Sequence, residues 1–179
     1  MPSDRENNTG RTIELGDLPL RYLLDVVPDQ SPGGDPIVYE AHTRYDNVLG
    51  RALLPSGLGP FCRFREPSLP HLAGVMLFTV DGVPAYLQDV PDLNQAFNLR
   101  FGLIAPRQCY EGGDEQACRV NAEVLKAIRE GQVVSLWFRA TLNARQATVR
   151  ALTRHRQAGG ADPGWNLQVS QTLSKDAAP

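Results

Sequence analysis

The sequence predicts an α/β fold in which a small, three-stranded, largely antiparallel sheet is flanked by helices and preceded by an irregular, mostly helical N-terminal extension. One observation is the pair of apolar segments 74–80 and 83–87, which flank the dipeptide Asp81-Gly82, a strong signal for a β-hairpin turn. A second is the order of the segments from residue 74 onward, which is strand, strand, helix, helix, strand, helix. Three strands cannot bury both faces of a sheet by themselves, so we expect the helices to cover them.

The N-terminal extension is predicted from weaker patterns. Residues 1–10 are polar, and we expect them to be disordered. Residues 16–29 predict a short helix, because Asp17 suits an N-cap and the leucines that follow have helical spacing up to Pro28. Residues 37–54 alternate apolar and polar groups without a clean period, and we interpret them as helical too.

The return strand of the hairpin contains Pro84, which has no amide donor. We therefore expect this strand to lie at a sheet edge or to be locally irregular. A first helix follows, with Pro91 in its first turn.

The last three elements are predicted by their end signals and apolar spacing. A second helix begins near Asp114, whose carboxylate favours a helix N-terminus, and it stops at Gly131. Residues 133–138 read as the third strand, and Asn143 is the expected cap of the last helix.

The composition is that of an ordinary globular domain, with 42% hydrophobic and 21% charged residues. No apolar run reaches the ~20 residues of a membrane span, and the N-terminus lacks an apolar signal region, so we expect no membrane partner. The few cysteines favour a reducing cytoplasm as the location. The net charge of −2 hides an asymmetry, because residues 94–160 carry ten basic and five acidic side chains. This excess indicates either a local basic face or arginines that solvate ordinary helix surfaces.

The three cysteines, Cys62, Cys109 and Cys118, are too few and too scattered for a disulfide framework. Together with His71 they offer four candidate zinc ligands, but their spacing is not that of a zinc ribbon or finger. We therefore expect buried thiols and no metal site.

Short motifs follow one another along the second half of the chain: "GVM", "AYLQ", "DLNQAFN", "FGLIAPRQCYEGG", "ACRVN", "LWF" and "WN". This ordered series resembles the GIY-YIG nucleases over about residues 60–167. The resemblance implies three parts: an N-terminal extension at 1–59, a GIY-YIG-like domain at 60–167 and a C-terminal tail at 168–179.

Members of that family hydrolyse a DNA phosphodiester with one divalent metal. Tyrosines on the paired strands, an arginine on the first helix and a glutamate on a later helix supply the chemistry. By this resemblance one tyrosine remains here, as Tyr86, which is a residual catalytic residue or simply an aromatic that caps the hairpin face. The other family positions hold Met76, Gln88, Ala96 and Val149, none of which replaces the lost group. The loss of the metal-binding carboxylate and of the phosphate-binding arginine implies a large decrease in the rate of DNA cleavage.

The cations after the hairpin are the expected nucleic-acid contacts. Those on the last helix have no acid between them, and a polyanion would relieve their mutual repulsion. The candidates are Arg100, Arg107, Arg119, Arg145, Arg150, Arg154, His155 and Arg156.

The sequence thus predicts a catalytically degraded GIY-YIG-like domain that binds DNA or another nucleic acid, or regulates a bacterial DNA-processing or restriction-type defence system together with a protein partner. No cofactor is expected in that reading. One alternative is an active, divergent endonuclease that uses Mg or Mn and takes its carboxylates from Glu111, Glu115 or Glu123, or from a partner subunit. Another is a protein-interaction module that pairs with an active nuclease through its acidic first half.

Overall fold

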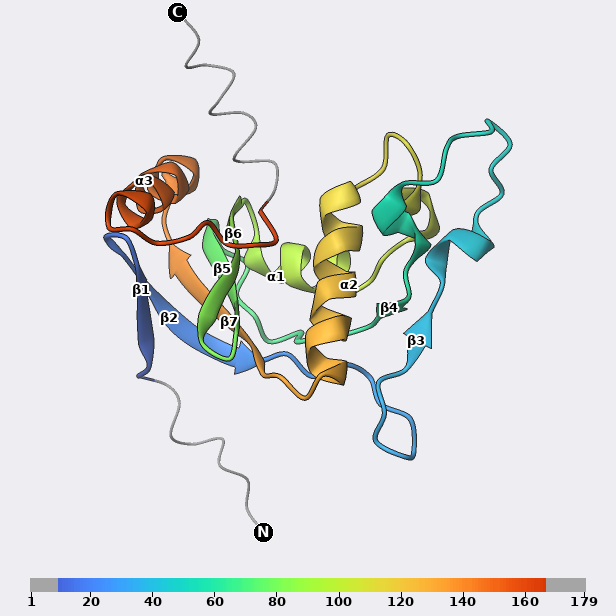
Figure 1. Ribbon diagram of the computed structural model, residues 1–179, viewed down its shortest axis with the longest axis horizontal. Coiled ribbons are helices and arrows are strands. Elements are labelled where there is room, and N and C mark those ends of the chain that lie inside the picture. The colour runs from blue at the N-terminus through green and yellow to red at the C-terminus, as the bar shows by residue number, and fades with distance from the viewer. Residues whose placement is uncertain (1–9, 167–179) are drawn as a thin grey trace, which may run out of the picture. The chain divides into compact units, whose positions relative to one another are not determined.

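The computed structural model describes residues 10–166 (Figure 1). Nearly all of the predicted disordered start and the whole predicted C-terminal tail lie outside the described residues. The chain divides into two compact units. Of the described residues, the sheet unit comprises 10–25, 73–90 and 135–166. The α2 unit, named after helix α2 (Glu115–Arg129), comprises residues 26–72 and 91–134. Among the described residues, no helix has the length and apolar character needed to cross a membrane.

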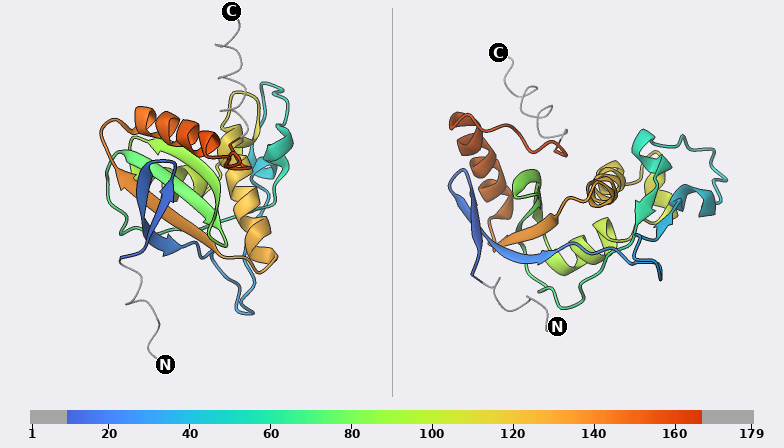
Figure 2. Two further views of the ribbon diagram at one scale, coloured as in Figure 1. Left: turned by 60° about the vertical axis from the view of Figure 1, so that its left-hand side comes forward. Right: turned by 60° about the horizontal axis from the view of Figure 1, so that its bottom comes forward.

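The sheet unit is built on five antiparallel strands in the order β1-β2-β7-β5-β6. The strands are β1 (Thr12–Leu15), β2 (Leu18–Asp25), β5 (Gly74–Val80), β6 (Val83–Val90) and β7 (Val134–Ala140). The sheet curls, and helix α3 (Ala144–Gln157) lies across one of its faces (Figures 1 and 2).

The core of the sheet unit lies between this face and α3. Small residues of α3 let the helix approach the strands closely, and Trp137 anchors the centre by donating its indole N–H to the Thr79 hydroxyl at 2.9 Å. Burying each of the larger aliphatic side chains contributes roughly 1.5–3 kcal/mol. The cluster comprises Leu15, Leu18, Leu20, Val75, Leu77, Leu87, Trp137, Ala144, Ala147, Ala151 and Leu152.

The predicted fold class is wrong at the N-terminal side. The sheet has five strands instead of three, and residues 18–25 form strand β2 instead of a helix. Leu18 and Leu20 point inward with period two, but the pairing with β7 slips between Tyr22 and Leu24. The bulge interrupts the two-residue period of the strand, so the spacing of the later leucines in the sequence resembles that of a helix. This resemblance explains the wrong prediction.

The helical interpretation of residues 37–54 is also wrong. This segment contains the short strand β3 (Val38–Tyr39) and one 3₁₀ turn (Ala41–Arg44), and it forms no α-helix. Strand β3 pairs with β4 (Phe61–Cys62) in a separate two-stranded sheet of the α2 unit.

The α2 unit is organised around helix α2 (Glu115–Arg129), which is the second predicted helix. The Asp114 carboxylate caps it by accepting from the Ala117 amide at 3.0 Å, and Gly131 follows its end with φ +77°. The first predicted helix is short: α1 (Leu93–Gln95) continues as a π-helical turn (Ala96–Phe101).

A buried asparagine ties α2 to the rest of its unit. The Asn121 side chain accepts from the Cys62 amide at 2.9 Å and donates to the Cys62 carbonyl at 2.8 Å. The same amide group donates to the Phe101 carbonyl at 2.7 Å. One α2 side chain therefore satisfies backbone groups of two separate segments.

Candidate functional site

The hairpin that carries Tyr86 is confirmed. Asp81 and Gly82 both have positive φ, at 49° and 81°, as a two-residue turn of the mirror-image type requires. Strand β6 is the last strand of the sheet, and its register with β5 slips beside Pro84. The strand that contains this proline therefore lies at a sheet edge and is locally irregular, as expected. The outer edge of β6 is covered because the Asn166 side chain bonds both backbone groups of Leu87, at 2.6 and 2.7 Å.

Tyr86 is buried at 2% exposure, and its hydroxyl donates to the Gln88 side-chain oxygen. Its ring stacks on Phe78 with centroids 6.5 Å apart, and Met76, which is fully buried, pairs with Gln88 across the two strands. The structure therefore brings three of the predicted positions together. Together with Phe78, these side chains supply a phenol, an amide, a thioether and a phenyl ring, but no carboxylate, imidazole or guanidinium.

The two other departures from the family pattern lie elsewhere. Ala96 is buried at the start of the π-helical turn in the α2 unit. Val149 is 45% exposed on α3, a helix that contains no acidic residue. The residues at the family's metal position therefore do not fit a divalent cation, since Val149 offers no ligand atom.

The carboxylates considered for an active enzyme belong to the α2 unit. Glu111 is exposed in the loop before α2, Glu115 is exposed in the first turn of α2, and Glu123 is half-buried farther along it. Among residues 10–166, no three His, Cys, Asp or Glu side chains gather in a group that could hold a metal ion.

The cations of α3 differ in whether a described acidic residue pairs with them. Arg145 and Arg154 are exposed and make no ion pair with any described residue. Arg150 pairs with Asp17 at 3.2 Å, although its side chain stays 62% exposed. Arg145, Arg150 and Arg154 therefore all present their guanidinium groups to solvent.

The last turn of α3 is fastened to the loop that follows it. Arg156 binds both carboxylate oxygens of Asp162, at 2.5 and 2.7 Å, and these bonds raise the pKa of its guanidinium. The His155 ring contacts the Ala161 carbonyl at 3.0 Å. Two of the predicted nucleic-acid contacts therefore have structural partners within the sheet unit.

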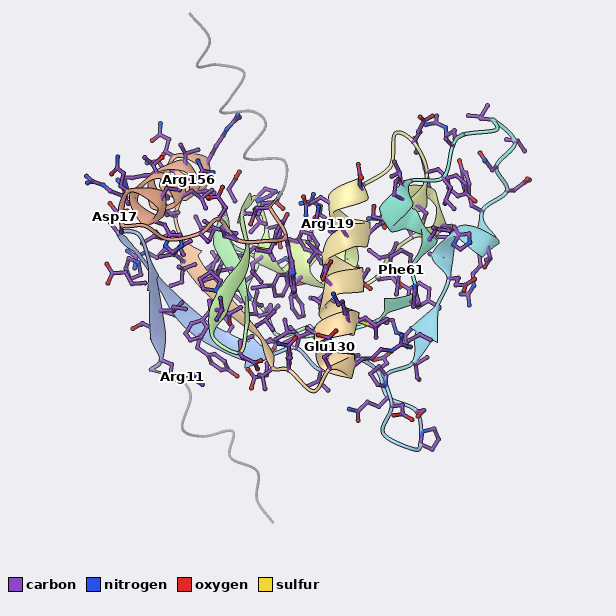
Figure 3. All side chains as sticks on the ribbon, in the orientation of Figure 1. Arg11, Asp17, Phe61, Arg119, Glu130 and Arg156 are labelled. Carbon is purple, nitrogen blue, oxygen red and sulfur yellow. The ribbon has the colours of Figure 1, made fainter. Side chains whose placement is uncertain are left out.

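Asp17 is a partner that the sequence interpretation missed, because it placed this residue in a helix. It follows Gly16, which turns the chain between β1 and β2 with φ +64°. A Cβ atom on Gly16 would lie 2.4 Å from the Ala151 carbonyl oxygen, so the turn packs directly on α3. Figure 3 labels Asp17 at this turn, beside the helix. The Gly-Asp dipeptide is the signal that could have indicated a turn.

The remaining predicted cations belong to the α2 unit. Arg100 is held by the Asp114 carboxylate at 2.6 Å and lies over the Phe101 ring at 4.7 Å. Arg107 is exposed in a 3₁₀ turn, and Arg119 is half-buried on α2. These three do not belong to the same unit as the α3 cations.

The prediction of buried thiols is confirmed, since Cys62, Cys109 and Cys118 have no exposed surface. Burial raises the pKa of Cys62 to about 12 and raises the pKa values of the other two thiols as well. His71, the fourth candidate ligand considered for zinc, is exposed and bonds Asp92 at 2.9 Å.

Comparison of the chain with models of protein families, with curated protein sequences and with solved structures finds no match. The resemblance to the GIY-YIG nucleases therefore stays a prediction.

Proposed function

We propose that this chain is a catalytically degraded GIY-YIG-like domain that binds nucleic acid through α3. It would serve as a binding or regulatory component of a bacterial DNA-processing or restriction-type defence system, a setting that rests on the resemblance alone. The observation that carries the proposal is an acid-free helix on which Arg145, Arg150 and Arg154 are exposed.

The electrostatics of α3 support binding to a polyanion. Each cation that neutralises a phosphate releases condensed counterions, and this release supplies most of the sequence-independent affinity for DNA. Arg150 and Arg154 are four residues apart, so they repel each other by a few tenths of a kcal/mol in an isolated helix. A phosphate backbone across the helix relieves that repulsion, whereas the Asp17 carboxylate neutralises only Arg150.

The state of the hairpin supports the loss of catalysis. The surviving tyrosine is buried, and its hydroxyl is engaged by Gln88. Phosphodiester cleavage needs groups that offset the charge of the pentacoordinate phosphate. Met76, Ala96 and Val149 provide none at the positions where the resemblance places them.

Binding is tested by fluorescence anisotropy of a labelled duplex with the full chain, over about 50 to about 400 mM salt. Affinity should fall steeply with salt, and the double variant Arg145→Ala, Arg154→Ala should flatten the slope by about 2. The matched control is Arg65→Ala, which removes an exposed arginine from the α2 unit. Equal slopes for all three proteins would contradict the proposal.

Catalysis is tested by plasmid nicking with Mg²⁺ or Mn²⁺. We expect no nicking by the full chain under conditions where it binds the plasmid. Metal-dependent nicking that is lost on Glu111→Gln, Glu115→Gln or Glu123→Gln would show an active, divergent endonuclease and overturn the degraded site.

A further inference from the structure

Helix α3 presents an uncharged strip to solvent. Successive residues of an α-helix are turned by about 100°, so residues 146, 149, 153 and 157 fall within about 80° of one another. Their side chains, those of Gln146, Val149, Thr153 and Gln157, are all exposed. The opposite side of the helix is buried in the core of the sheet unit.

Arginines border this strip on both sides. By the same rotation Arg145 and Arg156 fall on one border, and Arg150 and Arg154 fall on the other. Between Arg145 and Arg154 the helix rises about 14 Å, which is more than one helical turn. Arg156 is held by Asp162, so Arg145 is the available cation on the first border, while Arg150 and Arg154 are exposed on the second. The helix thus combines a central strip without charge and an exposed arginine on each side of it.

We propose that α3 enters the major groove of duplex DNA, an inference that rests on the nucleic-acid-binding function proposed above. An α-helix with its side chains is about 10–12 Å across, and the major groove of B-DNA is about 12 Å wide. Bordering arginines then face the phosphates of the two strands, which flank the groove on either side. The uncharged strip faces the base edges.

The strip has the side chains that read base edges. A glutamine amide donates and accepts at the same time, which matches the N6 and N7 groups of adenine, and Gln146 and Gln157 lie three turns apart on the strip. The apolar Val149 between them suits a thymine methyl group. Thr153 donates its hydroxyl to the Val149 carbonyl at 2.9 Å, which leaves its methyl group for apolar contact. The geometry therefore favours sites that contain A·T pairs.

An acidic partner helix is the competing occupant of this face. Helix pairing needs an apolar seam, but Val149 is the only large apolar side chain that α3 exposes, and Leu142 lies in the turn before the helix. A second copy of the chain is disfavoured because two acid-free α3 helices repel each other. A polar strip with exposed arginines on both sides fits a DNA groove better than it fits a protein helix.

The test compares a B-form DNA duplex with an RNA duplex of the same sequence, using the full chain. The major groove of A-form RNA is too narrow for a helix, so DNA should bind at least about tenfold more tightly. Methyl green, a major-groove ligand, should displace the protein, whereas netropsin, a minor-groove ligand, should not. Equal affinity for the two duplexes, or displacement by netropsin alone, overturns the inference.

A second variant separates base reading from phosphate contact. The double variant Gln146→Ala, Gln157→Ala should reduce the preference for A·T-containing duplexes at least about fivefold and leave the salt slope unchanged. Gln95→Ala, at an exposed position on α1, is the control. If the wild type shows salt-dependent binding but the double variant keeps its full preference, major-groove reading is wrong and the proposed function stands. If neither duplex is bound at low salt, both fail together.

Discussion

Asp17→Asn should increase the affinity of the chain for duplex DNA. Asp17 pairs with Arg150 at 3.2 Å, and the β1–β2 turn holds it there because Gly16 packs against the Ala151 carbonyl. A phosphate that contacts Arg150 competes with this carboxylate for the guanidinium. The substitution removes the competitor while keeping the size and shape of the side chain.

The size of the effect follows from the exposure of the pair. The Arg150 and Asp17 side chains are 62% and 44% exposed, and such surface ion pairs contribute about 0–1 kcal/mol. Releasing Arg150 should therefore strengthen binding by up to about fivefold and steepen the salt slope by less than about 1. The free energy of unfolding should change by no more than about 0.5 kcal/mol.

The assay is an anisotropy titration with a double-mutant cycle. Asp29→Asn is the matched control, since Asp29 pairs with Arg63 at comparable exposure, in the α2 unit. Both variants lose one negative charge, but only Asp17→Asn should strengthen binding. In an Arg150→Ala background the gain should vanish. An equal gain in the control, or a gain that survives Arg150→Ala, would show a general charge effect instead of competition between Asp17 and phosphate for Arg150.

Three further predictions concern the fold. Asn121→Ala should lower the free energy of unfolding by about 3–5 kcal/mol in urea denaturation, because it removes the buried bonds of the Asn121 side chain to the Cys62 amide and to the Cys62 and Phe101 carbonyls; a loss below about 1 kcal/mol would contradict these bonds. Gly74→Ala should prevent folding or lower the melting temperature strongly, because the new Cβ would lie 2.3 Å from the Arg139 carbonyl oxygen; an unchanged melting temperature would contradict the pairing of β5 with β7. Burial raises the pKa of Cys62 from 9.0 to about 12. The stability that the neutral Cys62 thiol contributes to the fold should therefore be complete below pH 9 and be lost as the pH rises toward 12. Ellman's reagent should label no thiol at pH 8 until urea is added.

The elements that the sequence predicted correctly are those with local signals. Asp81-Gly82 specifies the hairpin turn by its own backbone preferences, and the N-cap Asp114 and the terminal Gly131 mark the two ends of α2. Each of these signals acts within a few residues of the structure it forms. Local chemistry therefore sufficed for them.

The elements that the sequence did not predict depend on partners far away in the chain. Strand β2 pairs with β7, more than a hundred residues later, and its bulge between Tyr22 and Leu24 disguises the strand period. The acidic partner of Arg150 comes from the turn at Asp17, which the same pairing places beside α3. The basic character of α3 was readable from the sequence, but which of its arginines are neutralised was not.

The salt dependence of duplex binding decides whether α3 is a nucleic-acid-binding helix. A labelled duplex should bind the full chain at about 50 mM salt, with an affinity that falls log-linearly as salt increases. The slope should become shallower by about 2 in the variant Arg145→Ala, Arg154→Ala, and it should stay unchanged in Arg65→Ala. Absence of binding at low salt, or a slope that is the same with and without the α3 arginines, would show that α3 does not bind nucleic acid.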